Sequence, residues 1–276
     1  MNILDEIIAH KRAEVAERKS LYPVKLLESS IYFKTQPVSL KKYLLRPDKS
    51  GIIAEIKRKS PSWGTINGYV SVERTSIGYM QAGASALSVL TDLRFFGGKN
   101  EDLTTARKFN FCPILRKDFT VDAYQIIEAK SIGADAILLI AAVLKPAEIE
   151  QLARTAHDLG LEVLLEVHNL EELKASLSPH IDLVGVNNRN LKDFSVSTNT
   201  SLELAEHIPD AFVKVSESGI SQLATIRQLQ AAGYKGFLIG ETFMKHSRPE
   251  KACADLIQAL KNLGEQAVTG APGLSL

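Results

Sequence analysis

The chain has 276 residues, 45% of them hydrophobic, and its 33 basic and 32 acidic residues leave a net charge of +1. This balance excludes a global field that would hold a nucleic acid or a membrane surface, so charged ligands must be recognised locally. Two widely separated cysteines, Cys112 and Cys253, indicate neither a disulfide framework nor a zinc site. The sequence predicts a cytoplasmic protein in a reducing compartment, with no nucleic acid, membrane or metal as partner.

The first 48 residues precede the first β-rich run and are predicted to form a helical extension. Its apolar residues fall at helical spacing, without the continuous apolar core of a secretory signal (Ile3, Leu4, Ile7, Ile8 and Val15). The longest apolar run, residues 136–144, is about half of the roughly 20 residues that a membrane helix needs. We expect one domain, with the extension at 1–48, a barrel at 49–262 and a disordered tail at 263–276.

Eight short runs rich in Val, Ile and Leu follow the extension and alternate with helical stretches of similar length. Near-continuous apolar content is typical of strands covered on both faces, as in parallel sheets. Several helical stretches end on a glycine, the residue expected just past a helix C-terminus (Gly83, Gly133, Gly160 and Gly233). The predicted strands span residues 52–57, 86–91, 113–119, 136–143, 162–168, 183–189, 212–218 and 236–242.

The number of these units decides between two α/β architectures. Eight βα units fit a closed (β/α)₈ barrel better than a doubly wound sheet, which usually has five or six strands. The glycine-rich fingerprints GxGxxG and GxxxxGK[ST] do not occur in the sequence. We therefore predict an α/β fold, a (β/α)₈ TIM barrel with an N-terminal helical extension.

Polar residues gather where the predicted strands end, which is the rim that carries catalysis in this fold. Because side chains alternate across a strand, Glu55 and Lys57 share the face of Ile53 and point into the barrel. The same parity brings four residues of later strands into the mouth: Lys117, Glu166, Asn187 and Glu217.

A plug of satisfied salt bridges, Glu55 with Lys57 and Glu217 with Lys117, is the alternative to a functional site. Burying a charge costs several kcal/mol even after relaxation, so such groups are rarely collected without a use. Six polar side chains from five strands at one rim favour a site.

The loops after the seventh and eighth strands, residues 216–221 and 239–243, predict a phosphate cradle. Gly219 and Gly240 let backbone N–H groups approach an anion, and a helix starting near Ser221 adds its N-terminal dipole. These are the loops that bind phosphate in many such barrels. Tight βα turns would explain either glycine alone.

Seven motifs occur in order at the predicted strand ends: EIKRKSPS, SVLTD followed by FFGG, PILRKDF, LLEVH, GVNNRNL, KVSESGI and FLIG. Together they resemble the indole-3-glycerol phosphate synthases of tryptophan biosynthesis, over about residues 50–245. The resemblance implies a monofunctional carbon–carbon lyase that needs no metal or organic cofactor. Its substrate, 1-(2-carboxyphenylamino)-1-deoxyribulose 5-phosphate, closes to indole-3-glycerol phosphate with loss of carbon dioxide and water.

The resemblance also implies catalytic roles. Lys117 is similar to the general acid that protonates the keto oxygen, and Glu166 to the general base. Lys57 is similar to the residue that contacts the substrate carboxylate and serves as acid in dehydration, with the two lysines sharing these tasks. The remaining positions resemble supporting carboxylates and polar substrate contacts: Glu55, Glu217, Asn187 and Ser218. Acid function in Lys117 calls for a dry mouth and a neighbouring charge, Lys57, to temper its pKa.

Substrate-binding positions follow from the same resemblance. The phosphate contacts are Lys59, Ser60 and the N–H groups of Gly219, Gly240 and Glu241, with the Glu241 side chain turned away from the anion. Arg189 resembles a further substrate contact. Three phenylalanines are candidates for the wall around the anthranilate ring, and core packing explains each equally well: Phe95, Phe96 and Phe119. We expect a monomer or weak homo-oligomer, for which other enzymes of the tryptophan pathway are candidate partners.

Two other functions compete. The first is that of another phosphosugar barrel, for example an isomerase of the same pathway, which would share the phosphate loops. Such an isomerase normally uses a Cys/Asp or His-type acid–base pair. Cys112 does not fit this role, because it lies at the start of its strand, on the wrong rim. A catalytically dead barrel kept for binding would be expected to lack Lys57, Lys117 or Glu166, and all three are present. The six histidines show no metal spacing, and His168 is interpreted as a surface residue or a neighbour of the site.

Overall fold

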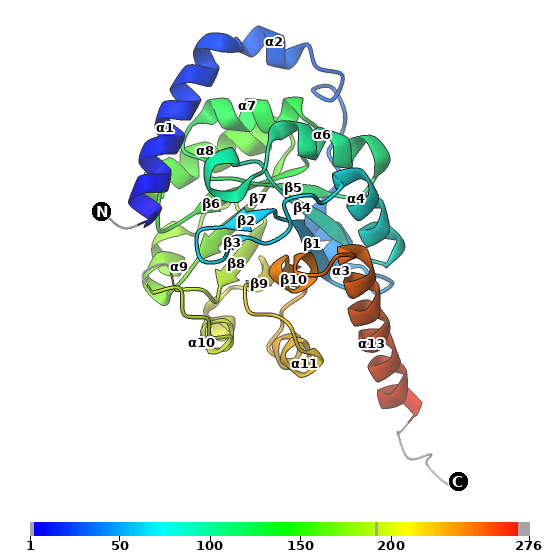
Figure 1. Cartoon of the computed structure of the whole chain (residues 1–276). Coiled ribbons are helices and arrows are strands. Elements are labelled where there is room, and N and C mark those ends of the chain that lie inside the picture. Colours follow the sequence, from blue (N-terminus) through cyan, green and yellow to red (C-terminus); the bar gives the residue numbers. More distant parts are fainter. Residues whose placement is uncertain (1–2, 191–192, 270–276) are drawn as a thin grey trace.

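The computed structural model describes residues 3–190 and 193–269. Eight parallel strands close into a barrel in the order in which they occur along the chain, which confirms the predicted fold (Figure 1). The barrel strands are β1 (Ile52–Ile56), β4 (Ala86–Leu90), β5 (Ile114–Lys117), β6 (Ala136–Ile140), β7 (Glu162–Val167), β8 (Leu183–Asn187), β9 (Val213–Glu217) and β10 (Gly236–Ile239). A short antiparallel pair that the sequence did not indicate, β2 (Lys59–Ser60) and β3 (Gly64–Thr65), follows β1.

Helices cover the outside of the barrel, and their ends follow local chemistry. Ser71 caps α4 by accepting the N–H of Arg74, and Gly160 adopts a φ of +75° two residues after α8 ends. The helices after β1 are α4 (Val72–Gln81), α5 (Leu93–Phe96), α6 (Asn100–Phe109), α7 (Ala123–Ser131), α8 (Pro146–Asp158), α9 (Leu170–Ser176), α10 (Asn199–Leu204), the 3₁₀ turn η1 (Ala205–His207), α11 (Leu223–Ala231), α12 (Glu241–Met244) and α13 (Pro249–Thr269).

Two apolar layers follow from the alternation along each strand. Ile52, Ala54 and Ile56 of β1 pack with the helices in the outer layer, whereas Ile53 belongs to a separate cluster inside the barrel. The inner cluster takes one or more residues from every barrel strand, and all are fully or almost fully buried. The predicted parity is therefore correct, and the inward-facing residues above this cluster form the mouth.

The extension consists of α1 (Ile3–Leu21), α2 (Val24–Glu28) and α3 (Leu40–Leu45). Figure 1 shows α1 and α2 along the outside of the barrel, beside α7. In contrast, α3 reaches the inner cluster, to which it contributes Leu40 and Leu44. Its position at the N-terminal ends of the strands is fixed by Glu162, the first residue of β7, which accepts the N–H of Lys41 at 2.8 Å.

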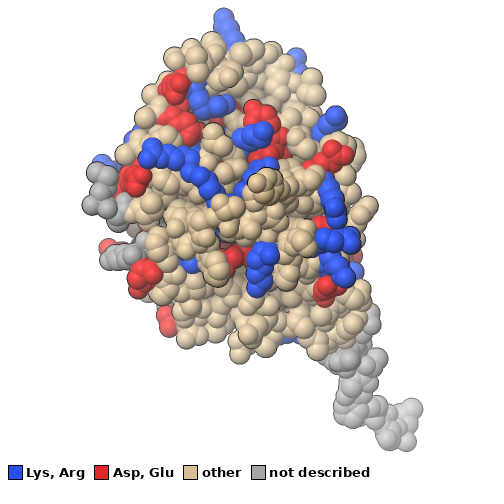
Figure 2. All heavy atoms as spheres, in the orientation of Figure 1, with Lys and Arg blue, Asp and Glu red and all other residues tan. Residues whose placement is uncertain are grey.

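The C-terminal helix α13 runs to Thr269 and so continues past residue 263, where the sequence predicted a disordered tail. The rest of that predicted tail, residues 270–276, lies outside the described residues. In the described part of the chain, no helix is both long and apolar enough to cross a membrane. Figure 2 shows acidic and basic side chains intermixed on one face of the molecule, as the net charge of +1 leads one to expect.

Candidate active site

The mouth of the barrel holds a cavity of about 150 Å³ at the C-terminal ends of the strands. Its lining contains most of the residues that the sequence placed there, and their side chains come from β1, β5, β7, β8, β9 and the loops that follow. They are Glu55, Lys57, Ser60, Phe96, Lys117, Phe119, Glu166, Asn187, Arg189, Glu217, Ser218 and Glu241.

Lys117, the last residue of β5, stands between two carboxylates. Its Nζ donates to Glu166 Oε2 at 2.9 Å and lies 3.5 Å from Glu217 Oε2. The Lys117 side chain is 16% exposed, against 4% for Glu166 and 2% for Glu217. The sequence had paired Lys117 with Glu217, and the structure adds the shorter contact with Glu166. An ammonium and a carboxylate are thus in direct contact at the floor of the cavity.

Lys57 forms a second ion pair, with Glu55, which lies two residues earlier and points to the same side of the chain. Its Nζ lies 3.2 Å from Glu55 Oε1, and Glu55 Oε2 accepts the hydroxyl of Ser88 at 3.2 Å. Gly240 gives Glu55 the space it needs, because a Cβ at that position would lie 2.5 Å from Glu55 Oε1. The absence of a side chain at Gly240 therefore makes room for the ion pair.

The pKa of Lys117 is raised above its usual value. Burial acts to lower it, but the charges of Glu166, Glu217 and Glu55 together outweigh burial. Lys57, which the sequence expected to temper this pKa, is itself paired with Glu55, and three carboxylates face the Lys117 ammonium. The raised pKa keeps Lys117 protonated at neutral pH.

The pKa values of the two glutamates beside Lys117 are shifted in opposite directions. Burial acts to raise the pKa of Glu166, but Lys117, His168 and the amide of Asn187 bring it down to about 2. Burial, helped by Glu166 and Glu55 and opposed by Lys117, raises the pKa of Glu217 to about 8. Glu166 is therefore ionised at neutral pH, whereas Glu217 takes up a proton at a much higher pH than Glu166 does.

Asn187 at the end of β8 connects Glu166 to the loop after β9. Its Nδ2 donates to Glu166 Oε1 at 3.1 Å, and its Oδ1 accepts from the hydroxyl of Ser218 at 2.9 Å and the N–H of Arg189 at 3.0 Å. Ser218 has a φ of +68°, a left-handed conformation that is uncommon outside glycine and that concentrates at functional sites. This network fixes the orientation of the Glu166 carboxylate.

The predicted cradle is a second cavity, of about 530 Å³, adjoining the first. Its lining includes Gly219, with a φ of +72°, and Gly240, together with the residues after each of them. Glu241 is also present, and its carboxylate pairs with Arg189 at 3.2 Å across the mouth. The helix after Gly219 is α11, which begins at Leu223, two residues later than Ser221.

Two residues expected at the site lie apart from both cavities. Lys59 donates through Nζ to the backbone carbonyl of Arg94 in α5, so its ammonium is directed away from the glycines of the cradle. Phe95 packs edge-on against His10 of α1, with ring centroids 5.8 Å apart. Phe96 and Phe119, whose ring centroids are 5.9 Å apart, do line the mouth cavity.

Several residues at the mouth were missed or only partly assigned by the sequence reasoning. His168, expected to be a surface residue or a neighbour of the site, is a neighbour: it is 11% exposed, with Nε2 3.5 Å from Glu166 Oε1 and Nδ1 3.2 Å from Glu172 Oε2. Burial lowers the pKa of His168, but the contacts with Glu172 and Glu166 outweigh it and raise that pKa overall. The other missed residues include three from α1 and one from the loop after β8: Ile3, Leu4, Ile7 and Phe194.

The structure is a TIM barrel with an ammonium and a carboxylate in direct contact at the end of the barrel where this fold carries out catalysis. Among solved structures, thiamine phosphate pyrophosphorylase from Pyrococcus furiosus resembles it with a TM-score of 0.58 and 17% identity, over 82% of this chain and 99% of that one. A likeness at this identity supports the fold alone.

Sequence comparison is more specific. A family model described as indole-3-glycerol phosphate synthase matches residues 4–256. A relative of that name from Bacteroides thetaiotaomicron is 48% identical over 260 residues, which cover 94% of this chain and 99% of the relative. Another, from Acidithiobacillus ferrooxidans, is 41% identical over 258 residues, covering 92% and 98%. The chain belongs to the indole-3-glycerol phosphate synthase family.

Proposed function

We propose that this chain converts 1-(2-carboxyphenylamino)-1-deoxyribulose 5-phosphate into indole-3-glycerol phosphate, carbon dioxide and water, the reaction of its family in tryptophan biosynthesis. The observation that carries the residue assignment is the 2.9 Å contact between Lys117 Nζ and Glu166 Oε2, flanked by Glu217. It supports Lys117 as acid and Glu166 as base.

In the first step, the ring carbon that bears the carboxylate attacks the keto carbon, and the carbonyl electron pair moves to oxygen. Lys117 gives its proton to this oxygen as the charge develops. A raised pKa does not prevent the transfer, because an alkoxide is a strong base. Before the transfer, the ammonium supplies preorganised positive charge in a cavity shielded from water. Breaking the bond to the carboxylate then releases carbon dioxide and returns two electrons to the ring.

The same transfer prepares Glu166 for its role. While Lys117 is an ammonium, its charge is the chief influence that holds the pKa of Glu166 down against burial. Once Lys117 has lost its proton, burial dominates and Glu166 becomes a better base. In the dehydration step the new hydroxyl leaves with a proton supplied by Lys57, and Glu166 removes the proton whose loss completes the indole ring. The acid and the base thus act in sequence.

Substrate binding distributes over the two cavities. The phosphate would take the cradle of Gly219, Gly240 and the N–H of Glu241, in the cavity that these residues line. The anthranilate ring would pack against the pair formed by Phe96 and Phe119. Lys57 is the ammonium available for the substrate carboxylate, at a cost to its pair with Glu55. Residence in the cytoplasm and a monomeric or weakly associating state remain predictions.

A turnover assay tests the proposal. The purified chain is incubated with the substrate, and the rise of indole fluorescence is followed, with the Lys117→Ala variant as control. We expect turnover by the wild type and loss of it in the variant. If the wild-type protein binds the substrate tightly and releases no product, the chain is a binding protein and the proposal fails.

A further inference from the structure

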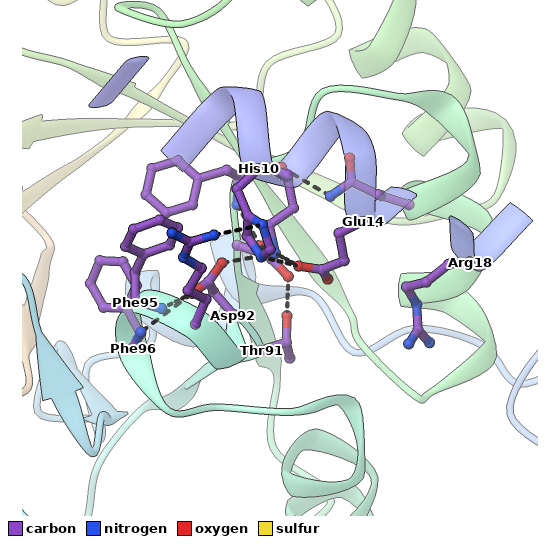
Figure 3. Close-up of polar contacts among 12 residues, drawn as sticks. His10, Glu14, Arg18, Thr91, Asp92, Phe95 and Phe96 are labelled. Carbon is purple, nitrogen blue, oxygen red and sulfur yellow. Dashed lines mark hydrogen bonds and ion pairs between the residues drawn. The ribbon is translucent and has the colours of Figure 1, made fainter. Parts of the chain in front are cut away.

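A buried lysine of the extension reaches the rim of the barrel. Lys11 of α1 is 1% exposed, and its Nζ lies 2.9 Å from Asp92 Oδ2 and 3.0 Å from Asp118 Oδ1. Glu14, one turn further along α1, contributes a third carboxylate at 3.0 Å. Figure 3 shows α1 crossing the loop that carries Asp92, with His10 and Glu14 directed toward it.

This arrangement is costly for an anchor. Burying an ammonium with two carboxylates carries a large desolvation penalty, and a well-packed apolar residue often serves as well. The helix already has apolar anchors in Ile7 and Val15, each 4% exposed. Moreover, among the described residues the ammonium of Lys11, at 2.9 Å, is the group that compensates the buried Asp92 Oδ2. The cost suggests a purpose beyond docking α1.

Both aspartates hold parts of the mouth. Asp118 directly follows Lys117, and its Oδ1 accepts the N–H of Phe119 at 2.8 Å. Asp92 caps α5, since its Oδ1 accepts the N–H groups of Phe95 at 2.7 Å and Phe96 at 3.3 Å. The general acid and both rings of the substrate wall are therefore adjacent in sequence, or hydrogen-bonded, to groups that Lys11 holds.

We propose that Lys11 is a positioning residue for the reaction: by binding Asp92 and Asp118 together, it sets the ends of β4 and β5 and so places Lys117 and the ring wall. The inference rests on the proposed function. Lys11 touches no substrate and acts through the two aspartates. The N-terminal extension thereby determines catalytic geometry through a charge, in addition to covering the mouth with Ile3, Leu4 and Ile7.

A second ion pair of α1 provides a matched control. Lys19 Nζ lies 2.6 Å from Asp122 Oδ2, but these side chains are 45% and 34% exposed. Asp122 caps α7, and neither Lys19 nor Asp122 lines the mouth cavity. Removing Lys19 therefore weakens the docking of the same helix through an exposed contact that does not reach the cavity.

The experiment compares kcat, KM and melting temperature of Lys11→Met, Lys11→Arg, Lys19→Met and wild type, at a temperature where all are folded. Misplacing a catalytic group by about 1 Å can cost 10²-fold, so Lys11→Met should lower kcat about tenfold or more, with KM within about threefold. Lys11→Arg, which keeps the charge, should recover a substantial part of kcat. Lys19→Met should retain wild-type kcat. A folded Lys11→Met variant with wild-type kcat, or equal losses in Lys11→Met and Lys19→Met, would overturn the proposal.

A double variant with balanced charge provides a second test of the proposal if Lys11→Met does not fold. Lys11→Gln combined with Asp92→Asn removes one buried charge of each sign, yet Asp118 still lacks its ammonium partner. Its kcat should stay at least about fivefold below wild type, and a wild-type kcat in this folded variant contradicts the proposal. Because every value is relative to wild-type turnover, absence of turnover in the wild type would point to the proposed function instead.

Discussion

The ammonium of Lys117 and a carboxylate oxygen of Glu166 lie 2.9 Å apart although their strands, β5 and β7, are separated by β6. The contact exists because the barrel is closed, so that inward side chains of non-adjacent strands meet near its axis. It couples the protonation of the two groups, and the main predictions depend on that coupling.

Removing the ammonium should abolish most activity. General acid catalysis contributes about 10²–10⁴-fold, so Lys117→Ala should lower kcat by at least that factor. The fold should remain, because the barrel core below the mouth is unchanged. Fluorescence detection of product gives kcat, and circular dichroism checks the fold. Near-normal turnover in the variant would remove Lys117 from the acid role.

Neutralising the base should separate chemistry from binding. Glu166→Gln preserves shape, and an amide can still contact Lys117 and Asn187, but it cannot take up a proton. We expect kcat to fall by about 10²-fold or more while the substrate dissociation constant changes little. Isothermal titration measures the latter. If binding collapses instead, Glu166 is a binding residue.

The cradle should respond to a methyl group at Gly219. The φ of +72° disfavours any residue with a Cβ, and this Cβ would lie 2.4 Å from Val196 Cγ1. Gly219→Ala should raise KM about tenfold and weaken competitive inhibition by inorganic phosphate, with a smaller change in kcat.

Gly233→Ala is the matched control for Gly219→Ala. Gly233 also has a left-handed φ, of +94°, but lies at the end of α11, where its Cβ would make only ordinary contacts. The KM of Gly233→Ala should equal that of the wild type, although its left-handed φ also costs stability. An unchanged KM in Gly219→Ala would exclude Gly219 from the cradle.

The stability of the protein should depend on pH through Glu217. Burial raises the pKa of Glu217 from 4.5 to about 8, so the folded state binds a proton that the unfolded state releases near pH 4.5. This stabilisation is complete below about pH 4.5 and is lost as pH rises through about 8. The melting temperature of the wild type should therefore fall between pH 5 and pH 9 more than that of Glu217→Gln.

The comparison isolates Glu217. His168 also has a raised pKa, and its stabilisation is likewise lost as pH rises, but this residue is present in both proteins. The low pKa of Glu166 lies outside the pH window. Identical pH profiles of melting temperature in wild type and Glu217→Gln would show that Glu217 is ionised in the folded protein at neutral pH.

Near-continuous apolar runs were enough to predict the strands, and the alternation of side chains was enough to predict the inner and outer layers and the set of polar residues at the mouth. It could not predict which of them touch, because the stagger of a closed barrel decides that Lys117 meets Glu166. Nor could it predict the direction of a long flexible side chain such as Lys59, which binds the carbonyl of Arg94. Arg58, next to Lys57 in the sequence, faces the helices and pairs with Asp102 of α6.

The position of α3 bears on how such a barrel can be divided or transplanted. Leu40 and Leu44 precede the first strand in the sequence but complete the interior at the lower end of the barrel, where Leu44 Cδ1 approaches the backbone of Gly236. A chain that began at residue 49 would leave this end open to water and deprive Glu162 of the N–H of Lys41. Residue 48 therefore marks a change in secondary structure and not a boundary between independently folding units, and any graft of this barrel has to carry α3 with it.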